Sequence, residues 1–214
     1  MDSPFRYPKL KHRRTRTPPV YQNYRSYKPD LRLEFSGQCV YCCALDTNRQ
    51  ESFGVDHYRP RSVFPGLETK YLNLFYSCNR CNSCKRAFWP SASEMKAGVF
   101  IPNPCDYVMW EHMRYSGGTV TGISKAGSFT IGLLLLNDHE AVEYRQGLVS
   151  ALNALTGQIT AARKTLHEAK KIAEQAVPDD RGRAAAQCSR AAANLHRLQD
   201  AIRSLLGLAA PALH

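Results

Sequence analysis

The chain has 214 residues, which fits one globular domain with an appendage and is long enough to bury a core. It contains 29 Lys and Arg against 18 Asp and Glu, so its formal net charge is +11. This excess excludes an acidic activator or acidic-tail protein. It favours a polyanionic partner, of which nucleic acid is the commonest, over a merely solvated basic surface.

The positive charge is concentrated at the start of the chain. Residues 1–32 hold nine Lys and Arg against two Asp, with five prolines and four tyrosines between them. Prolines at this density prevent a long helix, and the charge opposes burial. We therefore predict a basic extended arm over residues 1–32 that buries no core and grips a nucleic-acid backbone. Its expected phosphate contacts are Arg13, Arg14 and Arg16.

Residues 33–136 predict short elements of mixed type. We expect a strand at 53–58 followed by a polar turn at 59–62, then a loop or strand over 67–76. A short helix should run from 79 to 88 and end before Pro90. Further along, strands at 119–123 and 128–131 could pair across residues 124–127.

Residues 137–214 predict a helical hairpin. Apolar residues recur at alternating spacings of three and four from 148 to 176 and again from 188 to 205, with Pro178 and Gly182 between. Two heptad helices joined by a short loop must run antiparallel, and Asn137 or Asp138 is a suitable first N-cap. The apolar stripe either packs on itself or on the rest of the chain, or docks a partner or a second copy.

The chain offers neither a membrane span nor an export signal. Its longest apolar run, residues 131–136, is far shorter than the roughly 18 residues that a span needs, and no apolar segment follows the basic N-terminus. These features predict a cytoplasmic protein with no membrane partner. In that compartment the eight cysteines are expected to be metal ligands or small buried hydrophobes, not disulfides.

Four of these cysteines form two C-x2-C pairs, Cys39 with Cys42 and Cys78 with Cys81. Two such pairs supply the four thiolates of a tetrahedral structural zinc site, with buried free thiols as the alternative. The 35 residues between the pairs leave room for a small enclosed insertion. Cys43 and Cys84 adjoin the pairs and are substitute ligands or bystanders.

The insertion carries Asp56-His57 and Pro60, then Asn73, and the second pair is followed at once by Asn82 and Lys85. In order and spacing, this pattern resembles the HNH endonuclease family over about 50 residues. The resemblance implies an α+β fold, with a ββα-metal core clamped by the four-cysteine zinc site and followed by the C-terminal antiparallel helical hairpin. The domains are then the arm at 1–32, the HNH nuclease domain at 33–136 and the hairpin at 137–214.

The resemblance also implies catalytic roles. His57 would be the general base, Asp56 and Asn82 would hold a Mg2+ or Mn2+ ion on the scissile phosphate, and Asn73 would fix the loop that aims His57. Many members have His where this chain has Asn82, so a hard ion is favoured over softer ones. Four further cations are expected to contact phosphate: Arg59, Arg61, Arg80 and Lys85.

Downstream residues around 100–105, 118–120 and 130–145 resemble a bacterial HNH subfamily found beside an ATPase in anti-phage systems, Septu-like or retron-associated. The resemblance implies a metal-dependent nuclease effector that cuts DNA, with an ATPase partner. Self-association through the hairpin is a separate expectation, which rests on its apolar stripe. Because the chain has no P-loop, any ATP use must come from another polypeptide. The alternatives are a non-catalytic zinc-dependent nucleic-acid-binding subunit and an RNA-cleaving HNH nuclease.

Overall fold

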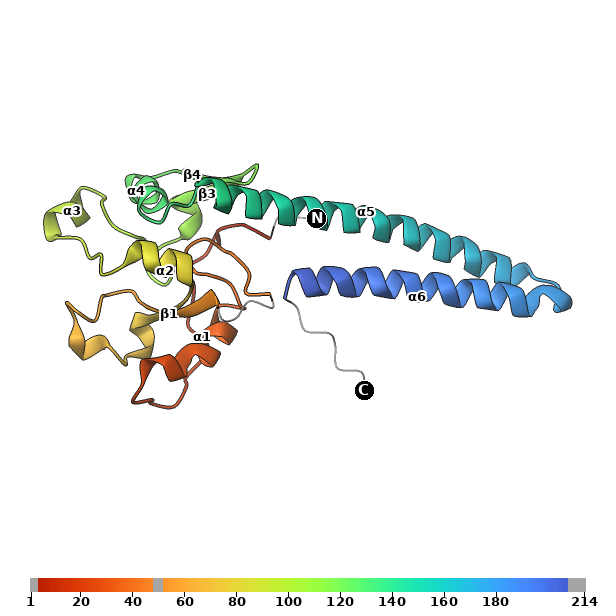
Figure 1. Ribbon diagram of the computed structural model, residues 1–214, viewed down its shortest axis with the longest axis horizontal. Helices are drawn as coiled ribbons and strands as arrows, with labels where there is room; N and C mark the ends of the chain where they lie inside the picture. The colour runs from red at the N-terminus through yellow and green to blue at the C-terminus, as the bar shows by residue number, and fades with distance from the viewer. Residues whose placement is uncertain (1–3, 48–51, 208–214) are drawn as a thin grey trace. The chain divides into compact units, whose positions relative to one another are not determined.

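A computed structural model of the chain describes residues 4–47 and 52–207 (Figure 1). The chain divides into two compact units, residues 3–146 and residues 147–214. Residues 1–3 of the expected arm and 208–214 of the expected hairpin lie outside the described residues. The expected division at residues 32 and 136 stays a prediction.

The centre of the first unit is a β-hairpin followed directly by a helix. Strands β1 (Phe53–His57) and β2 (Leu74–Cys78) pair antiparallel, with Phe53 opposite Cys78 and His57 opposite Leu74. Helix α2 (Asn79–Lys85) starts at once, because Cys78 is its N-cap and the Cys78 Sγ accepts a hydrogen bond from the Cys81 N–H. The short 3-10 helices η3 (Pro65–Leu67) and η4 (Tyr71–Asn73) lie in the connection between the strands. This order is the ββα arrangement that the resemblance to the HNH family implied.

The described part of the N-terminal segment is packed into this unit, contrary to the expectation of an arm that buries no core. It contains η1 (Tyr24–Tyr27) and α1 (Lys28–Glu34), and it buries Phe5, Tyr7, Tyr27 and Leu31. The Tyr7 hydroxyl donates to the Tyr41 carbonyl, and the Tyr7 ring stacks on Tyr115. Aromatic rings between the charges supply the apolar area that the composition of the segment conceals.

Glu34, at the end of α1, fastens the preceding segment. Its buried carboxylate accepts hydrogen bonds from the backbone N–H groups of Thr15 and Arg16 and from the Tyr71 hydroxyl, and it pairs with His12. Burial alone would raise the pKa of Glu34, but these hydrogen bonds outweigh it and lower the pKa to about 2. The carboxylate is therefore charged at neutral pH and holds residues 12–16 against α1 and η4.

The second small sheet differs from the predicted pairing. Strand β4 (Thr119–Gly122) pairs with β3 (Met113–Ser116), and residues 128–131 lie inside α4 (Lys125–Leu133). Two local features explain the difference. Gly117 and Gly118 adopt positive φ values in the β3–β4 turn, and the Ser124 side chain caps α4 by accepting from the Gly127 N–H. Helix α3 (Ala92–Lys96) and the 3-10 helix η5 (Met109–Glu111) follow α2 along the chain and precede β3.

The long helix α5 (His139–Gln175) begins in this unit. Asp138 caps it, since its Oδ1 accepts from the Ala141 N–H, whereas the Asn137 side chain bonds both backbone groups of Val120. The guanidinium of buried Arg145 donates to the carbonyls of Gly118 and Leu136. These contacts join the start of α5 to the β3–β4 turn.

The second unit is the predicted hairpin of helices. Beyond α5, the 3-10 helix η6 (Pro178–Asp180) leads into α6 (Arg181–Leu205), which Figure 1 shows alongside the C-terminal part of α5. Leu152 and Ile159 of α5 pack with Ile202 of α6 in a core that six partly buried leucines extend. Among the described residues, no helix combines the length and the apolar character that a membrane span requires.

Candidate active site and zinc site

The four cysteines of the two C-x2-C pairs come together as predicted. All four Sγ atoms lie within 4.8 Å of one another, and the Cys42 and Cys78 sulfurs are 3.7 Å apart. In a tetrahedral site with Zn–S bonds of about 2.3 Å, neighbouring sulfurs are separated by about 3.8 Å. The thiol group therefore fits a zinc ion. Cys43 and Cys84 do not belong to this group, which is the only candidate metal-ligand group among the described residues.

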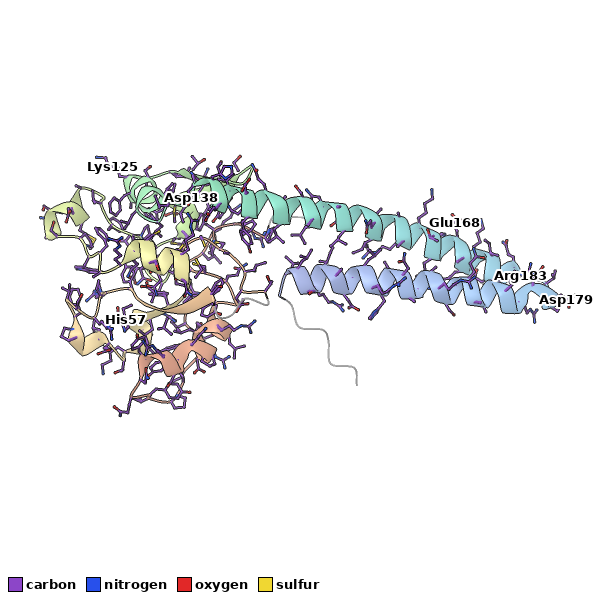
Figure 2. All side chains as sticks on the ribbon, viewed as in Figure 1. His57, Lys125, Asp138, Glu168, Asp179 and Arg183 are labelled. Carbon is purple, nitrogen blue, oxygen red and sulfur yellow. The ribbon has the colours of Figure 1, made fainter. Side chains whose placement is uncertain are left out.

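His57, labelled in Figure 2, ends β1. A backbone carbonyl holds its imidazole. The His57 Nε2 lies 2.9 Å from the Glu68 carbonyl oxygen. A carbonyl only accepts, so the neutral ring must carry its proton on Nε2, and the Nδ1 lone pair stays available as a base. Burial lowers the pKa of His57 below its usual 6.5, against the opposing effects of the Glu68 carbonyl and of Asp56.

Two side chains from outside β1 frame His57. The ring of Tyr24, from η1, meets the imidazole edge to face at a centroid distance of 4.6 Å. The Arg61 guanidinium lies 5.5 Å from the centre of the Tyr24 ring and forms an ion pair with Glu68 at 2.8 Å. The N-terminal segment thus contributes a residue to the surroundings of the imidazole.

Asp56, the neighbour of His57 on β1, points into the protein and is 2% exposed. Its Oδ2 accepts from the Tyr41 hydroxyl at 2.5 Å, and its Oδ1 accepts from the Lys85 ammonium at 3.1 Å. Lys85 is equally buried and also donates to the His57 carbonyl at 2.6 Å. An enclosed carboxylate that is already paired with a cation does not fit a catalytic Mg2+ site. Asn82, the other expected ligand, is half-buried one turn before Lys85 on α2.

Asn73 fastens the loop that follows His57. Its Oδ1 accepts from the Arg59 N–H at 2.9 Å, and its Nδ2 donates to the carbonyls of Arg59 and Leu67. The Tyr58 N–H in turn donates to the Asn73 carbonyl. These bonds are compatible with the predicted loop-fixing role of Asn73, which stays a prediction until it is tested by mutation.

Residues 39–88 match the family model described as HNH endonuclease. This segment is of the HNH family. It begins at the first zinc-site cysteine and includes β1, β2 and α2, so the resemblance seen in the sequence is confirmed.

A second comparison matches the Septu protein PtuB of Bacillus thuringiensis, with 27% identity over 154 residues. The alignment covers 70% of this chain and 52% of that protein, so the chain spans about half the length of the relative it matches. The match reaches well beyond the HNH segment and supports the resemblance to an anti-phage HNH protein. No solved structure matches the chain.

In the HNH segment, the cations expected to contact phosphate differ in their exposure and in the partners that they already have. Arg59 is exposed and lies over the rings of Phe64 and Trp89. Arg80 instead donates to the Leu135 carbonyl and to Asp138, and Lys85 is buried with Asp56. This burial of Lys85 differs from the predicted phosphate contact, because the ammonium serves as the counter-ion of an inward carboxylate.

In the N-terminal segment, Arg13 is exposed and Arg16 lies 3.9 Å from Asp30. Arg14 differs from the expectation. Its guanidinium lies among the rings of Phe35, Tyr71 and Phe75, and it donates to the Leu74 carbonyl at 2.7 Å. A guanidinium stacked in this way supports the fold of the HNH segment and is not presented to a phosphate.

Three residues near His57 and Asp56 were not among the predicted site residues: Tyr24, Tyr41 and Glu68. Glu68 acts through its carbonyl, for which a sequence holds no signal. Tyr24 lies 33 positions before His57 in a segment that was expected to be extended. Tyr41 carried a usable signal, because it lies between Cys39 and Cys42, and a residue between two cysteines of the cluster is held close to β1.

Proposed function

We propose that the chain is an endonuclease that hydrolyses DNA phosphodiester bonds, with His57 as the general base. The observation that carries this proposal is the His57 imidazole in the HNH segment, with Nε2 on the Glu68 carbonyl and a lowered pKa. A neutral ring with Nδ1 available is competent to take a proton from an attacking water at neutral pH. The excess of positive charge and the exposed Arg59 support a polyanionic substrate.

We further propose that cleavage needs a divalent ion, Mg2+ or Mn2+, in addition to structural zinc. HNH nucleases use metal ions, and such an ion stabilises the charge that develops on phosphate. Assigning Asp56 and Asn82 as its ligands requires Asp56 to leave its contact with Lys85. In the described arrangement, the chain's own residues orient the base and fix the loop beside it.

The test is cleavage of supercoiled plasmid by the full chain in Mg2+ or Mn2+, with and without EDTA. The His57→Ala variant should lose at least about a hundredfold in rate, as expected for loss of a general base. It should keep its zinc and its melting temperature. His139→Ala is the matched control, because His139 is an exposed histidine on α5. A His57→Ala protein that cuts at the wild-type rate would refute the role of His57.

The same experiment separates the alternatives. A non-catalytic zinc-dependent binding subunit would shift the plasmid in a gel without nicking it in either metal. An RNA-cleaving HNH nuclease would degrade a single-stranded or structured RNA and leave the plasmid intact. We favour DNA because attack on a phosphodiester by activated water needs no 2′ hydroxyl.

We also propose that the chain acts in anti-phage defence with an ATPase partner, on the basis of its similarity to Septu protein PtuB. The hairpin offers apolar side chains for assembly with that partner or a second copy, since Ile172 is 50% and Val177 60% exposed. In an Ile172→Asp, Val177→Asp variant, less of the ATPase encoded beside the chain should co-purify with it. Sedimentation of the chain alone should also show less self-association. Unchanged assembly would exclude this tip of the hairpin as the docking site.

A further inference from the structure

A side-chain hydroxyl links the first cysteine pair to β1, in addition to the β1–β2 pairing that ends at Cys78. Tyr41 lies between the zinc-site residues Cys39 and Cys42, and its side chain is 0% exposed. Its hydroxyl donates to the Asp56 Oδ2 at 2.5 Å. A phenylalanine ring would fill the same space, so the hydroxyl is the part of Tyr41 that acts on Asp56 specifically.

From the opposite side, Lys85 completes the enclosure of Asp56. Its ammonium donates both to the Asp56 Oδ1 and to the His57 carbonyl, so α2 holds two consecutive residues of β1. A buried ion pair of this kind gains little net stability, because removing two charges from water is costly. What it provides is a defined geometry, and here the geometry is that of the strand end that carries the His57 imidazole.

We propose that Tyr41 is a positioning residue, which transmits the order of the zinc site through Asp56 and Lys85 to His57. Asp56 is then an internal link in this chain and not an open metal ligand. The effect on cleavage rests on the proposed function, whereas the effect on the placement of His57 does not. Zinc binding and the placement of His57 are therefore coupled through the Tyr41–Asp56 hydrogen bond, in addition to the backbone pairing of β1 with β2.

The protein contains a matched control for this hydrogen bond. Tyr76 is also 0% exposed, and its hydroxyl donates to the Asp46 Oδ2 at 2.7 Å. Asp46 is paired with a cation as Asp56 is, in its case Arg32 at 2.5 Å. Tyr41→Phe and Tyr76→Phe therefore remove the same kind of buried bond to a paired carboxylate, and Tyr41→Phe alone removes the one to Asp56.

The experiment compares the full-length wild type with Tyr41→Phe and Tyr76→Phe. Zinc content and melting temperature are measured first, then side-chain 15N NMR of the histidines, with His57 assigned from the His57→Ala spectrum. Steady-state plasmid cleavage gives kcat and KM. We expect both variants to keep their zinc. Tyr41→Phe alone should shift the His57 ring signals and lower kcat by about tenfold, with KM within about twofold of the wild type.

Several results would overturn the proposal. Wild-type His57 signals and kcat in Tyr41→Phe would show that the hydroxyl does not position the base. An equal loss in Tyr76→Phe would point to general destabilisation. Loss of zinc from Tyr41→Phe would assign the hydroxyl to the zinc site itself. If the wild type cuts no nucleic acid, the proposed function fails, and the NMR comparison still decides whether Tyr41 positions His57.

Discussion

The orientation of His57 is set by one backbone carbonyl, and its protonation state is set by burial. Asp56 and Glu68 favour the charged ring and Arg61 opposes it, while the ring of Tyr24 contacts the imidazole. The net result is a pKa below 6.5. A base with a lowered pKa is free at neutral pH and is lost only in acid.

This direction predicts the pH dependence of cleavage. As pH falls through the lowered pKa of His57, Nδ1 becomes protonated and the cleavage rate should fall. At pH values above this pKa the rate should be constant. Arg61→Gln removes a charge that lowers the pKa of His57, so the midpoint should move to higher pH. The measurement is kcat/KM against pH for both proteins. A midpoint that moves down, or an unchanged profile, would contradict this assignment.

Single residues also mark where sequence reasoning stops. The spacing of Asp56, His57 and Asn73 predicted a site, and the structure gathers these residues around β1. The same reasoning predicted that Lys85 contacts phosphate, because lysine is rarely buried. Only the fold shows that Asp56 and the His57 carbonyl surround the Lys85 ammonium.

Among the elements, β1, β2 and α2 all lie next to the two cysteine pairs. The first pair precedes β1 and the second ends β2 and starts α2, so the thiol cluster joins the pieces of the HNH segment. The segment is short and its sheet has two strands, which is marginal without additional stabilisation. A metal ion held by the four thiols of the folded state would supply that stabilisation.

Loss of this metal should therefore affect stability and cleavage together. Cys81→Ser should lose zinc and destabilise the first unit by at least about 3 kcal/mol, since binding of a structural zinc contributes directly to folding. Cys84→Ser is the control and should keep its zinc, because Cys84 lies outside the cluster. Metal analysis and thermal melting check both variants. Zinc loss from Cys84→Ser would show that Cys84 replaces one of the four ligands.

The elements were predictable where pattern and local chemistry agree. The strand expected at 53–58 forms over Phe53–His57, and the two heptad series form α5 and α6, with α5 running through Gly147 and Gly157. The second sheet was mispaired because Ser124 caps a helix, a choice that competes with a turn for the same residue. Gly127 confirms the close packing there, since an added Cβ would lie 1.8 Å from the His112 carbonyl oxygen.

In the whole molecule, the N-terminal segment that carries most of the excess positive charge is packed on the first unit and is not a free arm. Glu34 and the buried aromatic residues hold the N-terminal segment on the first unit, so deletion of residues 1–28 would also remove Phe5, Tyr7 and Tyr27 from the core. Composition predicts a polyanionic partner, which stays a prediction, and it gave no indication that the same segment is part of the fold. Point variants are therefore the sharper test of nucleic-acid binding.

Exposed cations of this segment should contribute to binding in a salt-dependent way. Lys11 and Arg13 are exposed. If both contact phosphate, the double variant Lys11→Gln, Arg13→Gln should reduce the slope of log K against log salt by roughly 1.8 on duplex DNA. Lys170→Gln, Lys171→Gln on α5 is the matched control. A slope equal to that of the wild type would place the backbone contacts elsewhere.

The crowding of the four thiols has a consequence for the handling of the protein. Burial opposes ionisation of Cys39, but hydrogen bonds from the neighbouring thiols outweigh it and hold the pKa of Cys39 well below its usual value. Without zinc, a thiolate a few ångströms from three other sulfurs is a target for oxidants. A disulfide there would consume two ligands and block reloading with zinc. Metal-free preparations should therefore lose their capacity to bind zinc in air and regain it only when a reductant is added before the metal.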